Sequence, residues 1–504
     1  MTPLNLDQDL QSVQEARNFL QEADKARRTL ASMTQEQIDA IVEAMAKAAR
    51  REAERLAAMA VEETGYGNVA DKTVKNLFAA VDVYESVRPL KTVGVLRRDE
   101  ERKVWEVAEP VGVVAGIVPS TNPTSTVIFK TLIAVKSGNA IVFSPHPAAA
   151  RCTHEAARIL REAGERAGAP AGLVQCLSRP TMAAVRELMT HPLTSVILAT
   201  GGREMVKAAY SSGKPAYGVG PGNVPVYVHP SADPAEAVRL IVRSKSFDYG
   251  TICASEQAVI VESGNKRQVV AELKRQGAYF LNETEKAKVA AIILSGGTLN
   301  PRIVGRSPRA IAEMAGITIP EGTRVIVAEE TGVGKEYPFS VEKLSPILAL
   351  YTVSDWREAS DLSRRLLDFG GLGHTFGIHC RDESVIRQFA LAQPAYRIVV
   401  NSGTTFGAIG ATTAIQPSLT LGCGAVGNNI TSDNIGPLHL LNIKRVAFGV
   451  KDAPEAPTAS AEPVQRPAAA KAEPPRCPFP GDIRKEDIME IIRDILKEMH
   501  EMKV

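Results

Sequence analysis

The sequence predicts an α/β protein with two α/β domains, and three observations support this class. First, a chain of 504 residues exceeds what one hydrophobic core usually holds, since single cores stop growing at about 250–300 residues. Second, continuous apolar segments, typical of strands covered on both faces, alternate with helical segments. Third, the alternation occurs in two series, one from Val111 and one from Val224. Such alternation indicates parallel sheets with helices on both faces.

The part of the chain before the first series is predicted to be helical. Residues 5–90 carry apolar side chains at helical spacing, most clearly over 35–64. The stretch 91–108 is predicted to be extended and, in part, an exposed strand. The strands expected in the first series are 111–119, 139–145, 174–178 and 195–200. The helices expected between and after them are 124–137, 149–167, 181–190 and 202–212. Sheets of this kind place ligand sites at the carboxyl ends of their strands.

The second series predicts a second parallel sheet. Its expected strands are 224–228, 257–263, 324–330, 347–353, 374–380 and 396–401. The segment 402–436 is rich in Gly and Thr, and we expect an ordered loop because it lacks the charge density of disordered chains. A last strand is expected over 440–450.

The composition changes after Val450. Residues 451–480 are mostly Ala, Pro and Glu, which predicts a disordered, semi-rigid linker. Residues 481–504 predict an amphipathic helix, because their large aliphatic side chains fall on one helical face. This face consists of Ile488, Ile491, Ile492, Ile495, Leu496, Met499 and Met502. The helix could dock on its own chain, but a long spacer favours delivery to another protein.

Composition and charge argue against several classes of function. The net charge of +2 gives no electrostatic reason to expect nucleic acid or an anionic membrane as a partner. No apolar run approaches the ~18 residues of a membrane span, and the N-terminus lacks the features of a signal peptide. The six cysteines are scattered, without paired spacing or a histidine cluster, so we expect no metal site and a reducing cytoplasm.

Cys253 is the candidate nucleophile. It lies between a helix expected to end near Phe247 and a strand expected to begin near Gln257, with Gly250 permitting a tight turn. A thiol on such a turn is accessible, and nearby backbone amides can lower its pKa. A lone cysteine is, however, more often a buried structural thiol. Spacing alone therefore leaves both interpretations open.

Several longer motifs accompany Cys253. They are PSTNPTSTVIFK (119–130), NAIVFSPHP (139–147), ILATGG (197–202), GVGPGNVPV (218–226), SFDYGTICASEQ (246–257), EKLSPILA (342–349), GHT (373–375) and PSLTLGCGAVGNNITSDNIGP (417–437). Through them the sequence resembles the CoA-acylating branch of the aldehyde dehydrogenase superfamily from about residue 10 to residue 450. That branch includes the propionaldehyde and acetaldehyde dehydrogenases of bacterial microcompartments and the dehydrogenase half of bifunctional aldehyde–alcohol dehydrogenases.

The resemblance implies a particular domain arrangement. It predicts an aldehyde dehydrogenase-like fold with a Rossmann-type cofactor domain, an α/β catalytic domain and a strand arm for oligomerisation. The implied ranges are 1–96 and 112–227 for the cofactor-binding domain, 97–111 and 434–450 for the arm, and 228–433 for the catalytic domain. It also implies a homodimer or a dimer of dimers.

The resemblance further implies a reaction. Cys253 would attack a short aliphatic aldehyde, NAD would accept the hydride, and coenzyme A would be the co-substrate that takes the acyl group. Hydrolytic relatives carry a water-activating glutamate in a Glu-Leu-Gly-Gly-Lys motif, where this chain has Gly218. Without that base water is a poor nucleophile, and the missing side chain is expected to leave room near the sulfur. A hydrolytic enzyme and an inactive cargo adaptor are the alternatives.

Site residues follow from the same motifs. Asn122 is implied as the oxyanion donor beside Cys253, although hydrolytic relatives carry this asparagine one position earlier, at Thr121. The alternative for Asn122 is a structural role in an Asn-Pro turn. The implied cofactor-binding residues are Pro119, Ser120, Thr121, Ser144, Thr200, Gly201, Gly202, Gly218 and Glu342. Those implied near the substrate are Ile252, Ala254 and His374.

For three of these residues the sequence leaves more than one role open. His374 could act on the acyl group or on the CoA thiol, or be a buried, hydrogen-bonded histidine, which the sequence favours. Glu342 could contact the nicotinamide ribose or be a surface carboxylate. Ser144 replaces the lysine that usually contacts the adenosine ribose, so NAD is the default and NADP the second option.

Residues 451–504 suggest where in the cell the protein is located. A Pro/Ala linker followed by a short amphipathic helix resembles, in this branch, an encapsulation peptide. We therefore expect an enzyme of the bacterial cytoplasm held in the lumen of a microcompartment, with shell or cargo proteins as partners of 481–504. A membrane-surface helix is the alternative, but its polar face would carry mainly Lys and Arg, whereas this one mixes acids and bases.

Overall fold

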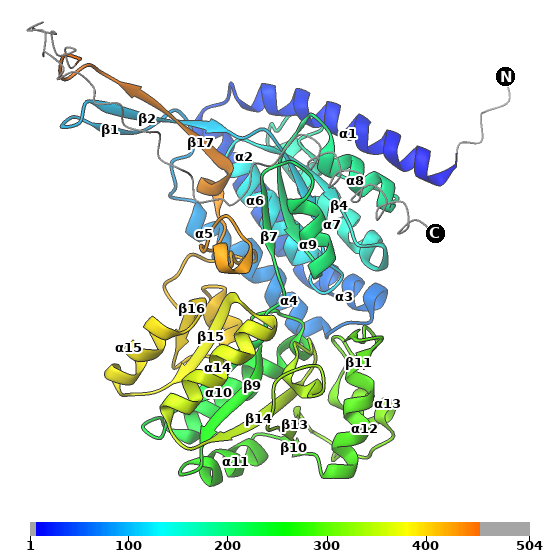
Figure 1. The fold of residues 1–504 in the computed structure, drawn as a ribbon. Helices are drawn as coiled ribbons and strands as arrows, with labels where there is room; N and C mark the ends of the chain where they lie inside the picture. The colour runs from blue at the N-terminus through cyan, green and yellow to red at the C-terminus, as the bar shows by residue number, and fades with distance from the viewer. Residues whose placement is uncertain (1–6, 454–504) are drawn as a thin grey trace, which may run out of the picture. The chain divides into compact units, whose positions relative to one another are not determined.

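The computed structural model describes residues 7–453, and one compact unit reaches Phe448 (Figure 1). Its first part is helical, as predicted. The helices are α1 (Gln8–Leu30), α2 (Gln35–Arg51), α3 (Ala53–Thr64), α4 (Val69–Leu77) and α5 (Tyr84–Val87), with a π-helical stretch, Phe78–Val83, before α5. Three of them begin at a side-chain cap: Asp7, Thr34 and Asn68 accept hydrogen bonds from first-turn backbone amides.

The first sheet has five parallel strands in the order β5-β4-β3-β6-β7. Its strands are β3 (Val113–Ile117), β4 (Ala140–Ser144), β5 (Val174–Cys176), β6 (Thr194–Thr200) and β7 (Ala216–Val219). The helices that connect them are α6 (Pro123–Lys136), α7 (Ala150–Arg166), α8 (Met182–Thr190) and α9 (Arg203–Tyr210). The chain proceeds outward from β3 to β5 and then returns to β6. The strand order therefore reverses between β3 and β6, where such sheets bind ligands.

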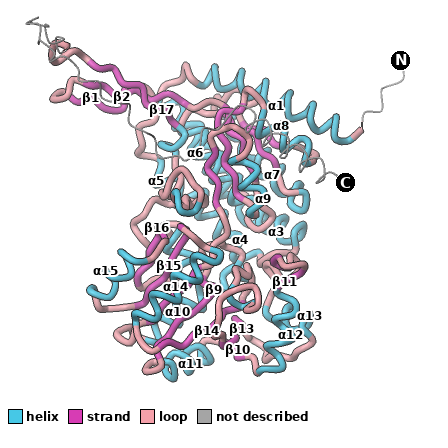
Figure 2. Tube along the Cα trace, in the orientation of Figure 1, coloured by secondary structure: helices cyan, strands magenta, loops and turns pink. Residues whose placement is uncertain are grey.

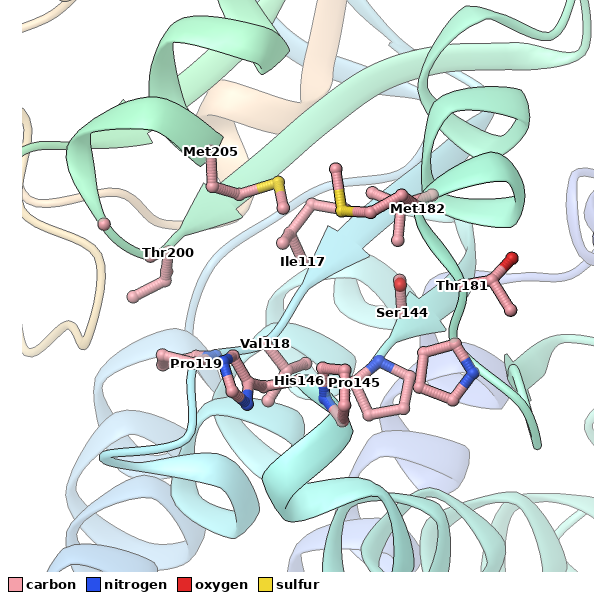
Figure 3. A pocket seen from close by; sticks show the side chains of 15 residues that line it. Ile117, Val118, Pro119, Ser144, Pro145, His146, Thr181, Met182, Thr200 and Met205 are labelled. Carbon is pink, nitrogen blue, oxygen red and sulfur yellow. The ribbon is translucent and has the colours of Figure 1, made fainter. Parts of the chain in front are cut away.

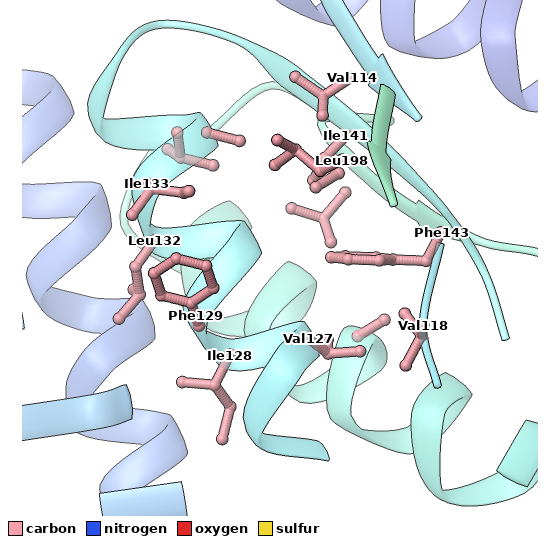
Figure 4. Packing of buried hydrophobic residues seen from close by; sticks show 14 of the residues in the cluster. Val114, Val118, Val127, Ile128, Phe129, Leu132, Ile133, Ile141, Phe143 and Leu198 are labelled. Atoms are coloured by element: carbon pink, nitrogen blue, oxygen red, sulfur yellow. The ribbon is translucent and has the colours of Figure 1, made fainter. Parts of the chain in front are cut away.

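Helix α6 lies at the centre of this domain. All of its residues are buried, and its apolar side chains pack against Val114, Ile141, Phe143 and Leu198 of the sheet (Figure 4). A helix that is apolar on all sides is typical of such a position. The two buried lysines of α6, Lys130 and Lys136, are its charged exceptions. The Lys130 ammonium donates to the carbonyls of Ile117 and Leu198, each at 2.7 Å. These bonds tie α6 to the two strands that flank the reversal point.

The second sheet has seven parallel strands in the order β10-β13-β14-β9-β8-β15-β16. Its strands are β8 (Val224–Val228), β9 (Glu256–Glu262), β10 (Ala278–Phe280), β13 (Val325–Glu329), β14 (Ile347–Val353), β15 (Gly373–His379) and β16 (Ala395–Val400). The associated helices are α10 (Pro234–Ser246), α11 (Lys266–Arg275), α12 (Glu283–Ile293), α13 (Pro308–Ala315), α14 (Trp356–Gly370), α15 (Glu383–Ala392) and α16 (Thr404–Ala408). A short hairpin, β11 (Leu294–Ser295) and β12 (Thr298–Leu299), precedes α13. Helices flank both larger sheets (Figure 2), which confirms the predicted α/β class.

The expected boundary between residues 227 and 228 is wrong. It would divide β8, and the whole of β8 pairs with β9 and β15 of the second sheet. The chain changes sheets over residues 220–223, between β7 and β8. Short elements were also missed: β7, β10, the β11–β12 hairpin, and α16, which lies within the expected loop 402–436.

A third, antiparallel sheet contains β1 (Val95–Asp99), β2 (Val104–Pro110) and β17 (Leu441–Ala447). Strand β17 pairs with β2 along its length and brings the two ranges expected to form the arm side by side (Figure 1). Trp105 of β2 contacts the ring of Phe448 edge-on at 5.3 Å. Most of the expected linker 451–480 and the entire expected helix 481–504 lie outside the described residues.

Candidate active site

Cys253 lies on a sharply bent loop between α10 and β9. Before it, Asp248 and Tyr249 have φ values of 47° and 51°, which non-glycine residues seldom adopt. Gly250 follows with φ 73°, and a Cβ there would lie 2.9 Å from the Ser345 carbonyl oxygen. The predicted turn therefore exists, and three consecutive left-handed residues direct the chain into Cys253.

His374, at the start of β15, contacts the sulfur. Its Nε2 is 3.2 Å from Cys253 Sγ, and its Nδ1 is 2.9 Å from Thr375 Oγ1. The Arg397 guanidinium donates to the carbonyl oxygens of His374, at 2.7 Å, and Gly373, at 3.3 Å. His374 is fully buried, as the sequence favoured, and it is also the immediate neighbour of the proposed nucleophile.

The electrostatics of the pair favour its neutral form. Burial raises the pKa of Cys253 to about 12, and the charge of Glu342 adds to this effect. Burial lowers the pKa of His374 to about 3, and the nearby Arg397 cation acts in the same direction. At neutral pH the pair is thus a thiol and a neutral imidazole. Such an imidazole can accept the thiol proton as sulfur attacks an electrophile.

Gly222 and Glu342 complete the surroundings of the sulfur. A Cβ on Gly222 would lie 2.1 Å from the Cys253 carbonyl oxygen and 3.2 Å from His374 Cε1, so only glycine fits. The Gly222 amide donates to Glu342 Oε1 at 2.8 Å. Burial raises the pKa of Glu342 to about 7, although this hydrogen bond opposes the rise. Glu342 therefore belongs to the site and is not a separate surface carboxylate.

Gly218 does not leave an open space. A Cβ there would lie 2.6 Å from Val206 Cγ1 and 3.0 Å from Tyr210 Cε2. The Tyr210 hydroxyl also accepts from the Gly218 amide at 2.9 Å and donates to its carbonyl at 3.2 Å. Side chains of α9 therefore fill the space directly beside Gly218. A glutamate at 218 would have to displace the side chains of Val206 and Tyr210.

Asn122 caps the N-terminal end of α6 near the same loop. Its Oδ1 accepts a 2.6 Å hydrogen bond from Lys75 Nζ, and its Nδ2 donates to Thr121 Oγ1 at 3.1 Å and to the Thr251 carbonyl at 3.5 Å. Because an ammonium only donates, the atom it contacts must be the amide oxygen. The NH₂ group of Asn122 thus faces the Cys253 loop, and the Thr121 hydroxyl supports it as an acceptor.

A pocket at the reversal point of the first sheet collects most of the predicted cofactor residues (Figure 3). Its lining consists of Ile117, Val118, Pro119, Ser144, Pro145, His146, Pro147, Pro180, Thr181, Met182, Val185, Thr200, Gly201, Gly202 and Met205. The predicted residues Ser120, Thr121, Gly218 and Glu342 are not part of this lining. Met182 and Met205 extend toward one another over Ile117, which gives the pocket an apolar wall suited to a flat ring.

The polar atoms of this pocket fit a dinucleotide. The hydroxyl oxygens of Ser144 and Thr200 are buried and have no hydrogen-bond partner within the described part of the chain. Buried hydroxyls normally have partners, and the hydroxyl or phosphate oxygens of a bound nucleotide would supply them. Gly202 is the cap residue of α9, so the free amides of that helix face the same region, where they favour a phosphate.

Replacement of Thr200 by valine should therefore weaken dinucleotide binding. Loss of one hydrogen bond of about 1.4 kcal/mol corresponds to a roughly tenfold higher Kd for NADH, measured by fluorescence titration. Thr131→Val is the matched control, because its hydroxyl is also buried and unpartnered among the described residues but lies in α6, outside the pocket. Equal Kd values for Thr200→Val and the unmodified protein would contradict the assignment.

Sequence reasoning missed several residues that shape the site. Lys72, Lys75 and Asp248 form a buried charged cluster under the Cys253 loop, and Arg397 supports the backbone of His374. The lysines sit in a helical segment that otherwise predicts an ordinary surface helix. Only their burial, 3% and 4% exposed, distinguishes them, and that property belongs to the tertiary structure.

Within residues 7–453 no group of three or more His, Cys, Asp or Glu side chains could hold a metal ion. Over the same residues, every helix is too short or too polar to cross a bilayer.

The fold and the site define an α/β protein with a pocket at the strand-order reversal of its first sheet and a cysteine–histidine pair at its second sheet. The chain belongs to the aldehyde dehydrogenase family, whose model matches residues 7–293. It is 69% identical to an acetylating aldehyde dehydrogenase from Geobacillus thermoglucosidasius, whose structure superposes with a TM-score of 0.89 over 89% of this chain and 100% of that one. The predicted resemblance to the acylating branch is thereby confirmed.

Other relatives extend the comparison. An aldehyde-alcohol dehydrogenase of Streptococcus pneumoniae is 48% identical over 401 residues, which are 78% of this chain and 45% of that protein. The chain thus spans about half the length of the curated aldehyde-alcohol dehydrogenases it matches. A propionaldehyde dehydrogenase from the Clostridium phytofermentans fucose utilisation bacterial microcompartment is 28% identical, with a TM-score of 0.78 over 86% of this chain and 97% of that one. One from Rhodopseudomonas palustris, with bound propionyl-CoA, is 26% identical, with a TM-score of 0.79 over 86% and 94%.

Proposed function

We propose that this protein is a CoA-acylating aldehyde dehydrogenase that converts a short aliphatic aldehyde, CoA and NAD to acyl-CoA and NADH. The observation that carries the proposal is the 3.2 Å contact between Cys253 Sγ and His374 Nε2 in a chain that also has a dinucleotide pocket. A neutral thiol beside a neutral imidazole is suited to attack a carbonyl. The similarity to an acetylating aldehyde dehydrogenase supports the same reaction.

The first half of the reaction oxidises the aldehyde. His374 Nε2 takes the thiol proton while Cys253 Sγ bonds to the carbonyl carbon, and a thiohemiacetal oxyanion forms. Asn122 Nδ2 and the Cys253 backbone amide are the donors assigned to this oxygen. Pro119, Ser144, Thr200, Gly201 and Gly202 would hold NAD, which would supply the hydride acceptor. The carbonyl reforms as hydride departs, which leaves an acyl thioester on Cys253.

The second half transfers the acyl group. The CoA thiol loses its proton to solvent as its sulfur attacks the thioester carbonyl, and the bond to Cys253 breaks. The released Cys253 thiolate takes back from His374 the proton that it gave up in the first half. One thioester replaces another, so the exchange needs little driving force. Gly218 offers no base for water, and Val206 and Tyr210 occupy the space where a glutamate would begin. This observation favours transfer to CoA over hydrolysis, and the intact pair argues against an inactive adaptor.

The order of these steps predicts a trapped intermediate. With aldehyde and NAD but no CoA, NADH formation should stop after about one equivalent per active site, because the thioester persists. Intact-mass and peptide mass spectrometry should then locate the acyl group on Cys253, and added CoA should release it as acyl-CoA. Continuous NADH formation without CoA, with free acid as product, would support the hydrolytic alternative.

The cofactor is proposed to be NAD, with NADP as a weaker alternative. The residues that line the described pocket include no aspartate or glutamate to repel a 2′-phosphate and no lysine or arginine to bind one. Selectivity must then come from the fit of the ribose alone, and we expect only modest discrimination between the two cofactors.

The antiparallel sheet is proposed as the oligomerisation arm. Val446 and Phe448, in and just after β17, are 42% and 48% exposed, an unusual position for large apolar side chains at the end of a strand. Pairing with the arm of a second subunit would cover them, in a homodimer or a dimer of dimers. A mass from light scattering near that of a single chain would contradict this.

Microcompartment targeting is proposed for the C-terminal segment. Its support is the sequence of 451–504 and a relative from a microcompartment. Deletion of residues 451–504 should leave turnover within about twofold of the full chain, since the proposed site lies elsewhere, while association with purified shell particles is lost. Retained association would exclude the encapsulation role.

A further inference from the structure

We propose that Lys75 is a positioning residue for the acylation step, because its buried ammonium holds Asn122 in the orientation that presents an N–H to the oxyanion. This inference rests on the proposed function, since it assumes that Asn122 is an oxyanion donor. It assigns a role to a side chain on α4 that lies 178 positions before the nucleophile in the sequence.

The Lys75 ammonium donates all three of its hydrogens to hydrogen bonds. Nζ donates to Asn122 Oδ1 at 2.6 Å, to Thr251 Oγ1 at 2.8 Å, and to Asp248 Oδ2. An ammonium has three protons, so each acceptor takes one. Asn122 and Thr251 lie on different segments, and the cation joins them. The asparagine amide therefore cannot rotate without breaking a buried, charge-assisted hydrogen bond.

The charge has a second consequence. A cation on Oδ1 draws electron density through the amide and makes the Nδ2 hydrogens better donors. One of these hydrogens is donated to Thr121 Oγ1 at 3.1 Å, and the other faces the Thr251 carbonyl at 3.5 Å, two residues before Cys253. The second contact is so long that its hydrogen can turn to an oxyanion formed at Cys253. A donor that is oriented and polarised before the reaction stabilises developing charge without reorganisation.

Lys72 serves as a control that distinguishes the positioning of Asn122 from a general contribution to the stability of the fold. Lys72 lies one turn earlier on α4 and is equally buried. Its Nζ donates to Asp248 Oδ2 at 2.9 Å and to the Thr121 carbonyl at 2.9 Å. Both lysines neutralise Asp248, but only Lys75 contacts the Asn122 side chain. Each can therefore be removed while the other still pairs with the buried carboxylate.

The experiment measures the single-turnover rate of NADH formation from acetaldehyde and NAD without CoA. The proteins are the unmodified full chain, Lys75→Met, Lys72→Met, Asn122→Ala and the double variant Lys75→Met/Asn122→Ala. We expect Lys75→Met to lower the maximal rate by about 10- to 100-fold, because loss of an oxyanion donor itself costs about 10²–10³-fold. The aldehyde concentration that gives half the maximal rate should change by less than about threefold. Lys72→Met should lower the rate by less than about fivefold.

The double variant gives the decisive comparison. If Lys75 acts through Asn122, the double variant should have a rate within about threefold of that of Asn122→Ala alone. Thermal unfolding and NADH binding of each variant check that the fold persists. If Lys75→Met does not fold, Lys75→Gln, which keeps a donor but no charge, replaces it in the same comparison.

Two outcomes overturn the inference: equal losses in Lys75→Met and Lys72→Met, or a Lys75→Met loss that is undiminished in the Asn122→Ala background. The proposed function is tested separately by the acyl-CoA product of the unmodified protein. Absence of that product overturns the function, whereas the comparison of variants overturns only the role of Lys75.

Discussion

Replacement of Cys253 by alanine is expected to lower CoA-dependent NADH formation by at least about a thousandfold, because removal of a nucleophile abolishes the covalent pathway and leaves only binding and oxyanion stabilisation. No thiohemiacetal can form, and therefore no acyl group can be retained by the protein. The measurement is the steady-state rate of NADH absorbance with saturating aldehyde, NAD and CoA. Mass spectrometry of the variant should show no acyl adduct.

A second cysteine gives the control for this variant. Cys176 lies in β5, is 3% exposed, and packs within the core of the first domain, apart from the sulfur–imidazole pair. Cys176→Ala removes a thiol that is more buried than that of Cys253 and should keep a turnover within about twofold of the unmodified protein, with some loss of thermal stability. If Cys253→Ala kept a rate within about tenfold of the unmodified protein, the covalent mechanism would be wrong.

Replacement of His374 by alanine is expected to reduce the single-turnover rate at neutral pH by about 10²–10⁴-fold, the usual contribution of a positioned base. The reason is the pKa of Cys253, which burial raises to about 12. Without the imidazole, the reactive thiolate must form by loss of a proton to solvent, and at neutral pH very little of it exists. The variant should still bind NADH, because His374 is not part of the dinucleotide pocket.

The pH dependence of this loss has a definite sign. Below the thiol pKa, the thiolate fraction rises tenfold per pH unit, so the deficit of His374→Ala should narrow as the pH increases from about 6 to about 9. The unmodified protein needs only a neutral imidazole, and the pKa of His374, about 3, keeps it neutral throughout. Glu342, with a pKa of about 7, also titrates in this pH range, and its ionisation affects the rates of both proteins. The measured quantity is therefore the ratio of the two rates, in which this shared effect cancels.

His379 provides the matched control for His374. It lies on the same strand, is 2% exposed, and burial lowers its pKa to about 4. Its ring is five residues along β15 from His374 and takes no part in the contact with Cys253. His379→Ala should lose stability but retain the pH dependence of the unmodified protein. A deficit of His374→Ala that stays constant across the pH range would show that the imidazole does not act as the base.

The arrangement of regular elements could be predicted where local patterns were long. The continuous apolar runs of β3, β4, β8 and β14 and the periodic helices before residue 90 matched the predicted elements. Several short elements without a continuous apolar run, such as β7, β10 and α16, were not predicted. Their sequences are too short to show a period, and pairing or packing with distant segments makes them regular. The boundary between residues 227 and 228, which the resemblance implied, was misplaced because strand pairing decides to which sheet β8 belongs.

By itself, the sequence determined the two parallel sheets, the bent loop that presents Cys253, and the motifs that collect around the dinucleotide pocket. Only the tertiary structure decided that His374, 121 residues away, contacts the sulfur, that α9 fills the space beside Gly218, and that Lys75 holds Asn122. Periodicity and turn chemistry act between near neighbours in the chain, so a sequence records them directly. Contacts between distant segments depend on how helices and sheets pack, and no local pattern records which side chains that packing brings together.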